Sequence, residues 1–400
     1  MKRNNLKTFT KFENPLLIFT SIILIAVIGS LSYYYYTDIR SAENTGTQLS
    51  QELKEAREES AKHKTELEEL KNVDQVVRND DLEKRIGQIE KTYQSAVERY
   101  EELLDLKTKT NKTTALDELY SKAVAQLAER NYSSASATLA TLQSEIRKAD
   151  AALATAFTIP ANVAESNTPP AAGSSRQSVT SEIGTYLVDI ISADLGSTRV
   201  IVDTASDGDC RNDCPVKSLG EYAARSGAFA GINGPYFCPA DYPSCADKKN
   251  SFDTLLMNKN KTYFNSDNNV YSTVPALIFS AGSGRLVGQS LEWGRDTGPD
   301  SVIASQPMTM SGGNVTFTGG GDPKQGSKGP RSFIGYTGSK VYIGVVHNAT
   351  VAEAAYVLKA LGVQNALNLD SGGSTALWSN GRYLAGPGRN TPFGILFVNR

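Results

Sequence analysis

The spacing of apolar residues predicts a helix near the C-terminus. Between Val351 and Leu361, apolar side chains recur at intervals of three and four residues, the period of a half-buried helix. Thr350 and Glu353 have the spacing of a capping box at its start, and Gly362 suits the left-handed residue that ends such a helix. The sequence therefore predicts a helix that begins after Thr350 and ends before Gly362.

Short apolar runs in the second half of the chain indicate strands. Residues 186–192, 198–203, 340–346 and 363–369 are mostly apolar or alternate between apolar and polar. Residues 219–226 have a helical pattern, and Gly, Asn and Pro separate many of the runs. We therefore expect an α+β C-terminal domain with a large mixed β component, long enough to bury its own core.

The N-terminal segment has the pattern of a membrane anchor. Residues 16–31 are almost continuously apolar, four tyrosines follow at 33–36, and no small-residue cleavage site comes next. A spanning helix needs about 20 apolar residues, and aromatic residues gather at membrane interfaces. The residues that precede the run include four basic ones: Lys2, Arg3, Lys7 and Lys11. We therefore expect a single-pass signal-anchor at 15–36, a cytoplasmic tail at 1–14 and an extracytoplasmic remainder.

Residues 45–156 have the composition of a helical stalk. They are highly charged and contain no cysteine, proline or tryptophan. Apolar residues between Leu82 and Leu103 follow alternating steps of four and three, which predicts a coiled coil and possible homo-oligomers. A helix that packs on the next helix of the same chain would show the same stripe, and residues 116–128 and 135–146 predict a helical hairpin. The stripe consists of Leu82, Ile86, Ile89, Tyr93, Ala96, Tyr100 and Leu103.

The composition changes after the stalk. Residues 157–179 are rich in Pro, Ala, Ser, Asn and Gly, which is typical of a flexible linker. We expect this linker to join the stalk to a separable C-terminal domain at 180–400.

All four cysteines lie in the C-terminal domain. Their even number suits a disulfide-forming compartment, and we expect each close couple to pair, Cys210 with Cys214 and Cys238 with Cys245. Other connectivities and a zinc site remain alternatives, although the spacings fit zinc poorly. Three aspartates near the first couple could hold calcium, but a solvated acidic loop is the simpler interpretation, so we expect no cofactor. They are Asp207, Asp209 and Asp213.

Charge and motifs exclude several classes of function. The formal net charge is −2, which argues against nucleic acid as a partner. The chain has no Walker or dinucleotide-binding motif. A Ser-His-Asp arrangement would depend on His347, and no nucleophile elbow supports one.

Residues 367–375 are the strongest candidate for chemistry. They read LNLDSGGST, so Asp370 falls at the end of the predicted strand, followed by two glycines and two hydroxyl-bearing residues. Glycines permit a close approach of the backbone to a ligand, and hydroxyl groups donate hydrogen bonds. Such a turn is also ordinary loop chemistry when it stands alone.

Two further motifs accompany this turn. Residues 231–237 read GINGPYF and follow an apolar stretch, and residues 329–335 read GPRSFIG and precede an alternating run. In order and spacing the three motifs resemble those of the phosphodiester glycosidase family, over residues 186–400. The resemblance implies a hydrolase that cleaves a sugar from a sugar-1-phosphodiester, with a glycan or envelope polymer of the cell envelope as substrate.

The resemblance also implies site residues. Asp370, Arg331 and Asn233 match family positions and are the expected catalytic residues. The expected substrate-binding residues are Gly234, Gly372, Gly373, Ser374, Thr375 and Arg389. A phosphate is already an acidic leaving group, so a second carboxylate that donates a proton is less necessary. The forked donors of arginine suit the phosphate, and a carboxylate suits the positive charge at the anomeric carbon.

The chain departs from the family pattern at three places. Pro235 replaces a glycine, Ser371 replaces the first glycine of a triple, and residues 345–348 read VVHN where Asp-Gly-Arg is common. An alternative function therefore remains open: a catalytically inactive protein that binds glycans or supports the envelope through its coiled coil.

Overall fold

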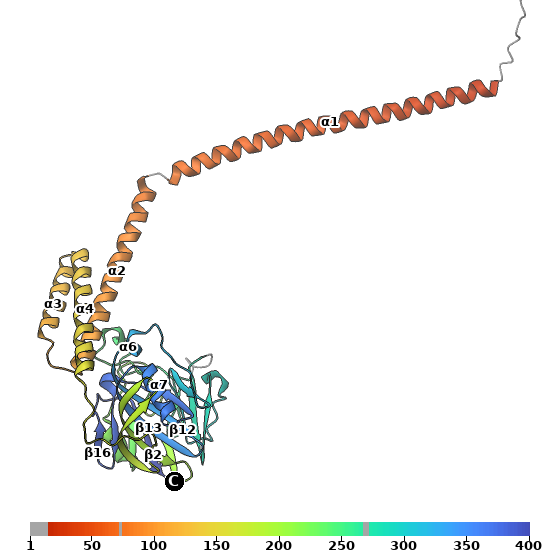
Figure 1. Cartoon of the computed structure of the whole chain (residues 1–400). Helices are drawn as coiled ribbons and strands as arrows, with labels where there is room; N and C mark the ends of the chain where they lie inside the picture. The colour runs from red at the N-terminus through yellow and green to blue at the C-terminus, as the bar shows by residue number, and fades with distance from the viewer. Residues whose placement is uncertain (1–14, 72–73, 267–271) are drawn as a thin grey trace, which may run out of the picture. The chain divides into compact units, whose positions relative to one another are not determined.

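The computed structural model describes residues 15–71, 74–266 and 272–400, and the expected tail at 1–14 lies outside them. Two compact units are distinguished, Met1–Gly87 and Gln88–Arg400. Helices dominate the described chain up to residue 156, and strands dominate from residue 173 onward (Figure 1). The helices are α1 (Pro15–Lys71), α2 (Asp74–Lys107), α3 (Thr114–Ala128), α4 (Tyr132–Ala156), α5 (Leu219–Ser226), α6 (Pro323–Gly326) and α7 (Val351–Ala360).

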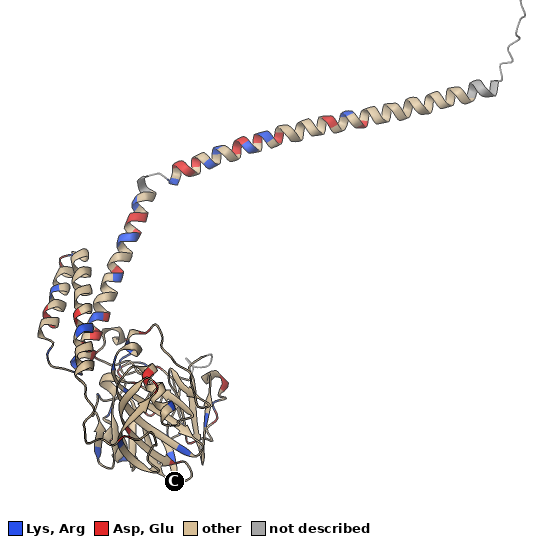
Figure 2. Cartoon of the chain, viewed as in Figure 1, with Lys and Arg blue, Asp and Glu red and all other residues tan. Residues whose placement is uncertain are grey.

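Helix α1 carries the apolar N-terminal run. From Thr20 onward it contains a stretch long and apolar enough to cross a membrane, and apolar side chains such as Ile25 are exposed. Figure 2 shows that the charged residues of α1 gather in the half nearer to its C-terminal end. The prediction of an apolar N-terminal helix is therefore confirmed.

Helices α2, α3 and α4 share an apolar core. Ala96, Leu103 and Leu106 of α2 are buried together with side chains of α3 and α4, such as Leu127 and Leu139. The amide of Ser134 donates to the Asn131 side chain, which caps α4 after the turn. The predicted hairpin is present, and the C-terminal part of the apolar stripe packs within the chain.

The rest of the stripe has a different environment. Leu82 and Ile86 are 54% and 53% exposed, whereas Leu103 is fully buried. The intramolecular alternative therefore accounts for the stripe from Tyr93 to Leu103, because side chains of α3 and α4 contact α2 there. Pairing of the exposed part with a second chain stays a prediction.

Antiparallel strands form three sheets in the described part of the C-terminal half. One sheet has seven strands in the order β1 (Gly173–Ser181), β2 (Gly184–Asp194), β13 (Lys340–Ala349), β12 (Gly329–Thr337), β14 (Asn365–Asn368), β10 (Met308–Ser311) and β11 (Asn314–Val315). A second has the order β16 (Arg382–Ala385), β15 (Leu377–Ser379), β4 (Ala230–Asn233), β17 (Phe393–Asn399) and β3 (Thr198–Thr204). The third has the order β6 (Tyr263–Phe264), β5 (Leu256–Met257), β9 (Ser301–Ala304), β7 (Ala276–Ser280) and β8 (Ser283–Val287).

The three sheets enclose one main apolar core. Ile343 of the first sheet, Ile395 of the second and Leu277 of the third belong to the same buried cluster. The opposite face of the seven-stranded sheet is covered by α7, whose Leu358 is fully buried. This layered arrangement, a sheet with one helix-covered face and one sheet-covered face, confirms a β-rich domain with few helices.

Local sequence signals explain the boundaries of α7. The Thr350 and Glu353 side chains form the predicted capping box, and Gly362 has φ of +73° just after the helix. The strand that follows, β14, is shorter than the predicted 363–369, because its ladder with β12 covers only residues 365–368. Asp370 therefore lies in the turn beyond the last paired residue.

The segment predicted as a flexible linker reaches into the sheet. Gly173–Ser181 forms β1 and pairs with β2 over its full length. Before it, Asn167 exchanges side-chain hydrogen bonds with the backbone of Thr180. The composition is typical of a linker, but pairing with an otherwise unpaired edge of β2 satisfies the backbone of β1. Residues 173–179 are therefore part of the sheet.

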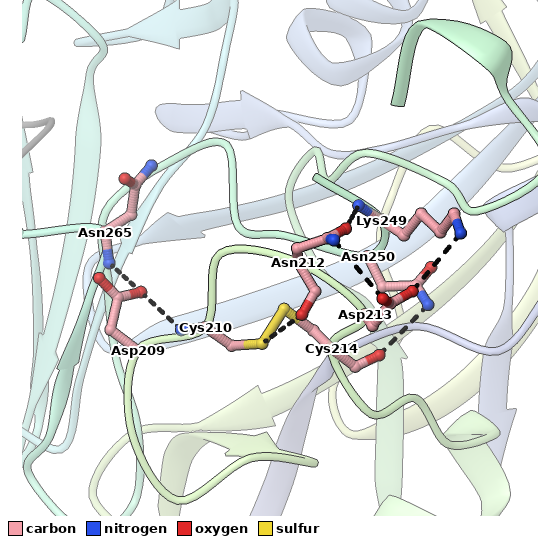
Figure 3. Close-up of a disulfide and its surroundings, with 8 residues drawn as sticks. All are labelled: Asp209, Cys210, Asn212, Asp213, Cys214, Lys249, Asn250 and Asn265. Carbon is pink, nitrogen blue, oxygen red and sulfur yellow. Dashed lines mark hydrogen bonds and ion pairs between the residues drawn. A yellow bond between two sulfur atoms is a disulfide. The ribbon is translucent and has the colours of Figure 1, made fainter. Parts of the chain in front are cut away.

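Both predicted disulfides are present. Cys210 pairs with Cys214 and Cys238 with Cys245. Figure 3 shows the first bridge: Asp209 accepts hydrogen bonds from the backbone of Cys210 and Asn265, whereas Asp213 contacts Lys249. Asp209 and Asp213 thus have separate partners. Among the described residues, no group of three His, Cys, Asp or Glu side chains is arranged to hold a metal ion.

Candidate active site

The three sequence motifs meet where two sheets end. Asp370 follows β14 of the seven-stranded sheet, and Asn233 ends β4 of a five-stranded sheet. The amide of Asp370 donates to the carbonyl of Gly234 at 3.2 Å, which joins the two strand ends. Arg331 lies on β12, next to β14, and Arg389 precedes β17. The fold therefore brings the predicted residues into one region.

Asn233 connects the motifs from behind. Its Nδ2 donates to the backbone carbonyl of Asp370 at 2.6 Å, and its Oδ1 accepts from the hydroxyl of Ser332 at 2.8 Å and from the amide of Ala376 at 3.1 Å. The side chain is 1% exposed and is not among the residues that line the pocket described below. This amide positions the turn of Asp370.

A cavity of about 340 Å³ opens in front of Asp370. This volume is at the lower end of the range for small-ligand pockets. The predicted residues that line it are Asp370, Arg331, Gly372, Ser374 and Arg389. Five of the nine predicted residues thus share one concave surface.

The carboxyl group of Asp370 has an unusual environment. Burial raises the pKa of Asp370 to about 6, and the charge of Asp105 adds to the rise. Hydrogen bonds from the side chain of Ser374 and from the amide of Ser371, together with the charge of Arg389, act in the opposite direction. The group is therefore ionised at neutral pH but protonated under mildly acidic conditions. Such a shift in a pocket is typical of functional carboxylates.

The turn after Asp370 needs its two glycines for different reasons. Gly372 has φ of +60°, in the left-handed region that L side chains rarely adopt. At Gly373, a Cβ would lie 2.5 Å from Nη2 of Arg389 and 2.8 Å from the methyl carbon of Thr108. Ser371, which replaces a glycine of the family pattern, has φ of −137° and is unstrained. The departure at Ser371 is therefore compatible with the turn.

Arg389 has an unusual guanidinium group. Within the described residues its Nη1 is buried and makes no hydrogen bond, although Asp241 Oδ2 lies 3.6 Å away at the exposed surface. Its guanidinium carbon lies 5.4 Å from the ring centre of Tyr242, a cation–π distance. A buried donor without a partner is costly unless a ligand satisfies it. Arg389 is therefore suited to bind an anionic group in the pocket.

Arg331 is engaged more fully with the protein. Its Nε donates to the carbonyl of Ala349 at 2.9 Å, and its Nη2 donates to the carbonyls of Lys324 and Ser327. These bonds hold the segment around α6 at the edge of the pocket. Burial lowers the pKa of Arg331, but the side chain remains a cation at neutral pH. Arg331 therefore both shapes the pocket and adds positive charge to it.

The remaining predicted residues lie outside the pocket lining. They are Asn233, Gly234, Gly373 and Thr375. A Cβ at Gly234 would collide with the ring of Phe393, so this glycine permits core packing. Thr375 is buried, and within the described chain its hydroxyl oxygen has no hydrogen-bond partner.

Several lining residues escaped the sequence-based prediction. Tyr236 belongs to the GINGPYF motif, and its hydroxyl accepts a hydrogen bond from the side-chain amide of Asn368, Nδ2, at 2.6 Å. Tyr242 lies between the two cysteines of the second disulfide. Glu101 and Asp105 come from helix α2. The position of Tyr236 beside a matched motif was a usable signal, whereas nothing local to α2 pointed to the pocket.

The third departure from the family pattern lies elsewhere. His347 Nε2 is 2.8 Å from Asp189 Oδ2, and its ring stacks on Phe157 at a centroid distance of 6.5 Å. His347 does not line the pocket with Asp370. Residues 345–348 therefore lie outside the lining of that pocket.

One carboxyl group and two arginines among the predicted residues thus line a single small pocket. The sequence model of the phosphodiester glycosidase family matches residues 226–398. This match agrees with the motif resemblance, and residues 1–225 and 399–400 lie outside it. No curated protein matches the chain.

Solved structures similar to this chain include three proteins of low sequence identity. A hypothetical protein from Synechocystis is 13% identical with a TM-score of 0.43, and the match covers 57% of this chain and 62% of that protein. The zebrafish N-acetylglucosamine-1-phosphodiester alpha-N-acetylglucosaminidase catalytic domain, auto-inhibited by its pro-peptide, is 14% identical with a TM-score of 0.45, covering 60% and 87%. A putative exported protein from Burkholderia pseudomallei is 12% identical with a TM-score of 0.35, covering 54% and 74%. The chain thus spans about three fifths of the Synechocystis protein.

Proposed function

We propose that this protein is a phosphodiester glycosidase that releases a sugar from a sugar-1-phosphodiester. The observation that carries the proposal is the pairing, in one pocket, of the Asp370 carboxyl with the buried Nη1 of Arg389, which makes no hydrogen bond within the described residues. The first group suits positive charge at an anomeric carbon, and the second suits a phosphate. The family match over residues 226–398 supports this pairing of roles.

The reaction needs little proton donation. The bond between the anomeric carbon and the phosphate oxygen breaks, and its electron pair leaves with the phosphate. A water oxygen bonds to the anomeric carbon and loses a proton, which gives the free sugar and a phosphomonoester. In this proposal Asp370, ionised above pH 6, stabilises the positive charge that develops at the anomeric carbon. Arg389, assisted by the charge of Arg331, holds the phosphate.

We also propose that the reaction takes place outside the cell membrane. The apolar stretch of α1 from Thr20 is proposed to anchor the chain in a membrane, with residues 1–14 cytoplasmic and the domain that starts near residue 180 outside. Two disulfides in that domain support an oxidising compartment. An envelope glycan joined through phosphodiesters is the proposed substrate. The exposed part of the α2 stripe, around Leu82 and Ile86, is the proposed contact for self-association.

The direct test is sugar release by the full chain. Wild type, Asp370→Asn and the control Asp247→Asn would be incubated with the methyl phosphodiester of N-acetylglucosamine 1-phosphate. Asp247 is an exposed carboxylate near the second disulfide that does not line the pocket. We expect release by wild type and the control, and a loss of at least about a hundredfold for Asp370→Asn.

Different outcomes would reject the proposal. If folded wild type released no sugar from this or other sugar phosphodiesters but still bound them, the alternative of a glycan-binding protein would be favoured. Release that Asp370→Asn leaves unchanged would remove Asp370 from the reaction.

A further inference from the structure

The last turns of α2 have two faces with different partners. Leu103 and Leu106 belong to the buried cluster formed with α3 and α4. Glu101, Asp105 and Lys109 follow one another at intervals of four residues, so they lie on a common side of α2 and of the turn that follows it. All three line the pocket that contains Asp370. We call these three residues the polar face of α2.

Each residue of the polar face bonds to the pocket rim. Glu101 Oε1 accepts from the amide of Ser244 at 3.1 Å, although Glu101 is only 9% exposed. Asp105 Oδ1 accepts from the hydroxyl of Tyr242. Lys109 donates to the carbonyl of Lys328 at 3.2 Å. The contacts reach both the disulfide-bonded loop and the segment before β12, so they lie on two sides of the pocket.

The residue that follows α2 packs on the turn of Asp370. The methyl carbon of Thr108 lies 2.8 Å from the position that a Cβ on Gly373 would take. Thr108 comes directly after α2, and Gly373 lies three residues after Asp370. Gly373 therefore has no side chain where Thr108 packs on this turn. This close fit is difficult to explain if the helical region is only a spacer.

Asp105 contacts two side chains that line the pocket. Besides Tyr242, it pairs with Lys324, whose Nζ lies 3.6 Å from Asp105 Oδ2. The same Nζ lies 4.5 Å from the ring centre of Tyr242. The Lys324 side chain is 50% exposed, so without this carboxylate little else would fix its position. One carboxylate from α2 thus fixes an aromatic ring and a cation together.

We propose that α2 supplies one wall of the substrate pocket and that Asp105 is a specificity-determining residue, which limits the size of the substrate by holding Tyr242 and Lys324 across the mouth. This inference rests on the proposed function for the reaction, and it narrows the substrate class: within the proposed envelope glycan, the unit attached to the phosphate of the sugar phosphodiester is compact. The small cavity of about 340 Å³ fits such a limit.

The test compares a compact and a bulky substrate. Full-length wild type, Asp105→Ala, Tyr242→Phe and the control Glu90→Gln would be assayed with the methyl phosphodiester of N-acetylglucosamine 1-phosphate and with the nucleotide sugar UDP-N-acetylglucosamine. Glu90 is an exposed carboxylate on the same helix, outside the pocket lining. For each protein, kcat/KM is measured for both substrates, and affinity for both is measured by calorimetry in the Asp370→Asn background.

The expected result is a change in selectivity. In Asp105→Ala, the ratio of kcat/KM for the bulky over the compact substrate should rise about tenfold, with a smaller rise in Tyr242→Phe and less than a twofold change in Glu90→Gln. The affinity ratio should shift in the same direction. A general loss of structure would lower kcat/KM equally for both substrates. The ratio of the two values therefore separates a role in specificity from a role in folding.

Three results would overturn the inference. An unchanged ratio in Asp105→Ala would show that the carboxylate does not set substrate size. An equal rise in activity toward both substrates would mean that α2 obstructs the pocket and does not complete it. Failure of the Asp370→Asn protein to bind either compound, together with no sugar release by wild type, would reject both this inference and the proposed function. Binding with the predicted affinity ratio but without hydrolysis would reject the proposed function alone.

Discussion

The side chain of Asn233 donates a hydrogen bond of 2.6 Å to the backbone carbonyl of Asp370. Asn233 ends a strand of one sheet and Asp370 lies in the turn after a strand of another, so this bond fixes the turn of Asp370 at the junction between the two sheets. The carboxyl group points into the pocket while its backbone is held from behind. The geometry of the site therefore depends on a buried amide that does not line the pocket.

Replacement of Asn233 should destabilise the protein. In Asn233→Ala, the hydroxyl of Ser332 and the amide of Ala376 lose their acceptor in a buried position. We expect the free energy of unfolding to fall by about 2–3 kcal/mol, measured by denaturant titration. The control is Asn111→Ala, an exposed position outside the sheets. Equal midpoints for the two variants would contradict the role given to Asn233.

Activity should depend on the ionisation of Asp370. Because its pKa is raised to about 6, kcat/KM should rise with pH below 6 and level off above pH 7, as the carboxylate form becomes complete. The pH profile of sugar release by wild type checks this. An acid limb with an apparent pKa near 4 would mean that burial does not perturb this group.

The same shift predicts a cost in stability. The folded-state pKa of Asp370 lies above its ordinary value of 3.8, so folding is penalised increasingly as pH rises from about 4 to 6, and fully above that range. Asp370→Asn removes the charge, and its free energy of unfolding should exceed that of wild type by up to about 3 kcal/mol at pH 7.5. At pH 4 the difference should nearly vanish. A variant less stable than wild type at pH 7.5 would argue against the penalty.

The two arginines should respond differently to lysine. Arg389→Lys keeps the charge but loses the forked donor aimed into the pocket, so kcat/KM should fall by at least about tenfold with little change in stability. Arg331→Lys should lower the free energy of unfolding as well, because three backbone carbonyls lose a partner. Arg382→Lys, at an exposed position, serves as the control. Similar stability losses in both pocket variants would contradict this division.

Gly373 should tolerate no side chain. In Gly373→Ala the new methyl group would collide with Arg389 and Thr108, which displaces the guanidinium group from the pocket. We expect kcat/KM for sugar release to fall by more than about tenfold. Gly208→Ala provides the comparison, since a Cβ there meets nothing within 4 Å. Full activity in Gly373→Ala would show that activity does not depend on the close packing at this turn.

Local signals in the sequence predicted much of the fold. The capping box of Thr350 and the glycine at 362 define α7 because both act within a few residues of the chain. The two disulfides could be predicted as well, because the cysteines of each pair are close in sequence. The motif around Asp370 pointed to residues that line the pocket, because it and two other motifs follow one another in the same order as in the family that the sequence resembles.

Features that depend on distant contacts were not predictable in this way. A polar residue every fourth position in α2, such as Glu101 and Asp105, looks like a solvated helix face, and only the tertiary structure places it against the pocket. The hydrogen-bond partners of Asn233 are distant in sequence, so the way in which its side chain holds the turn of Asp370 could not be predicted from local sequence. Residues 173–179 resemble a linker, because strand pairing at a sheet edge leaves little compositional trace.

The loop that carries Tyr242 is closed by the disulfide between Cys238 and Cys245, and both cysteines also line the pocket. Reduction would free this loop and, with it, the rim to which Asp105 is bonded. The shape of the pocket is thereby coupled to thiol chemistry. In a reducing compartment the two cysteines would stay unpaired and the loop would not be closed. The pocket would therefore reach its final shape only when this disulfide forms.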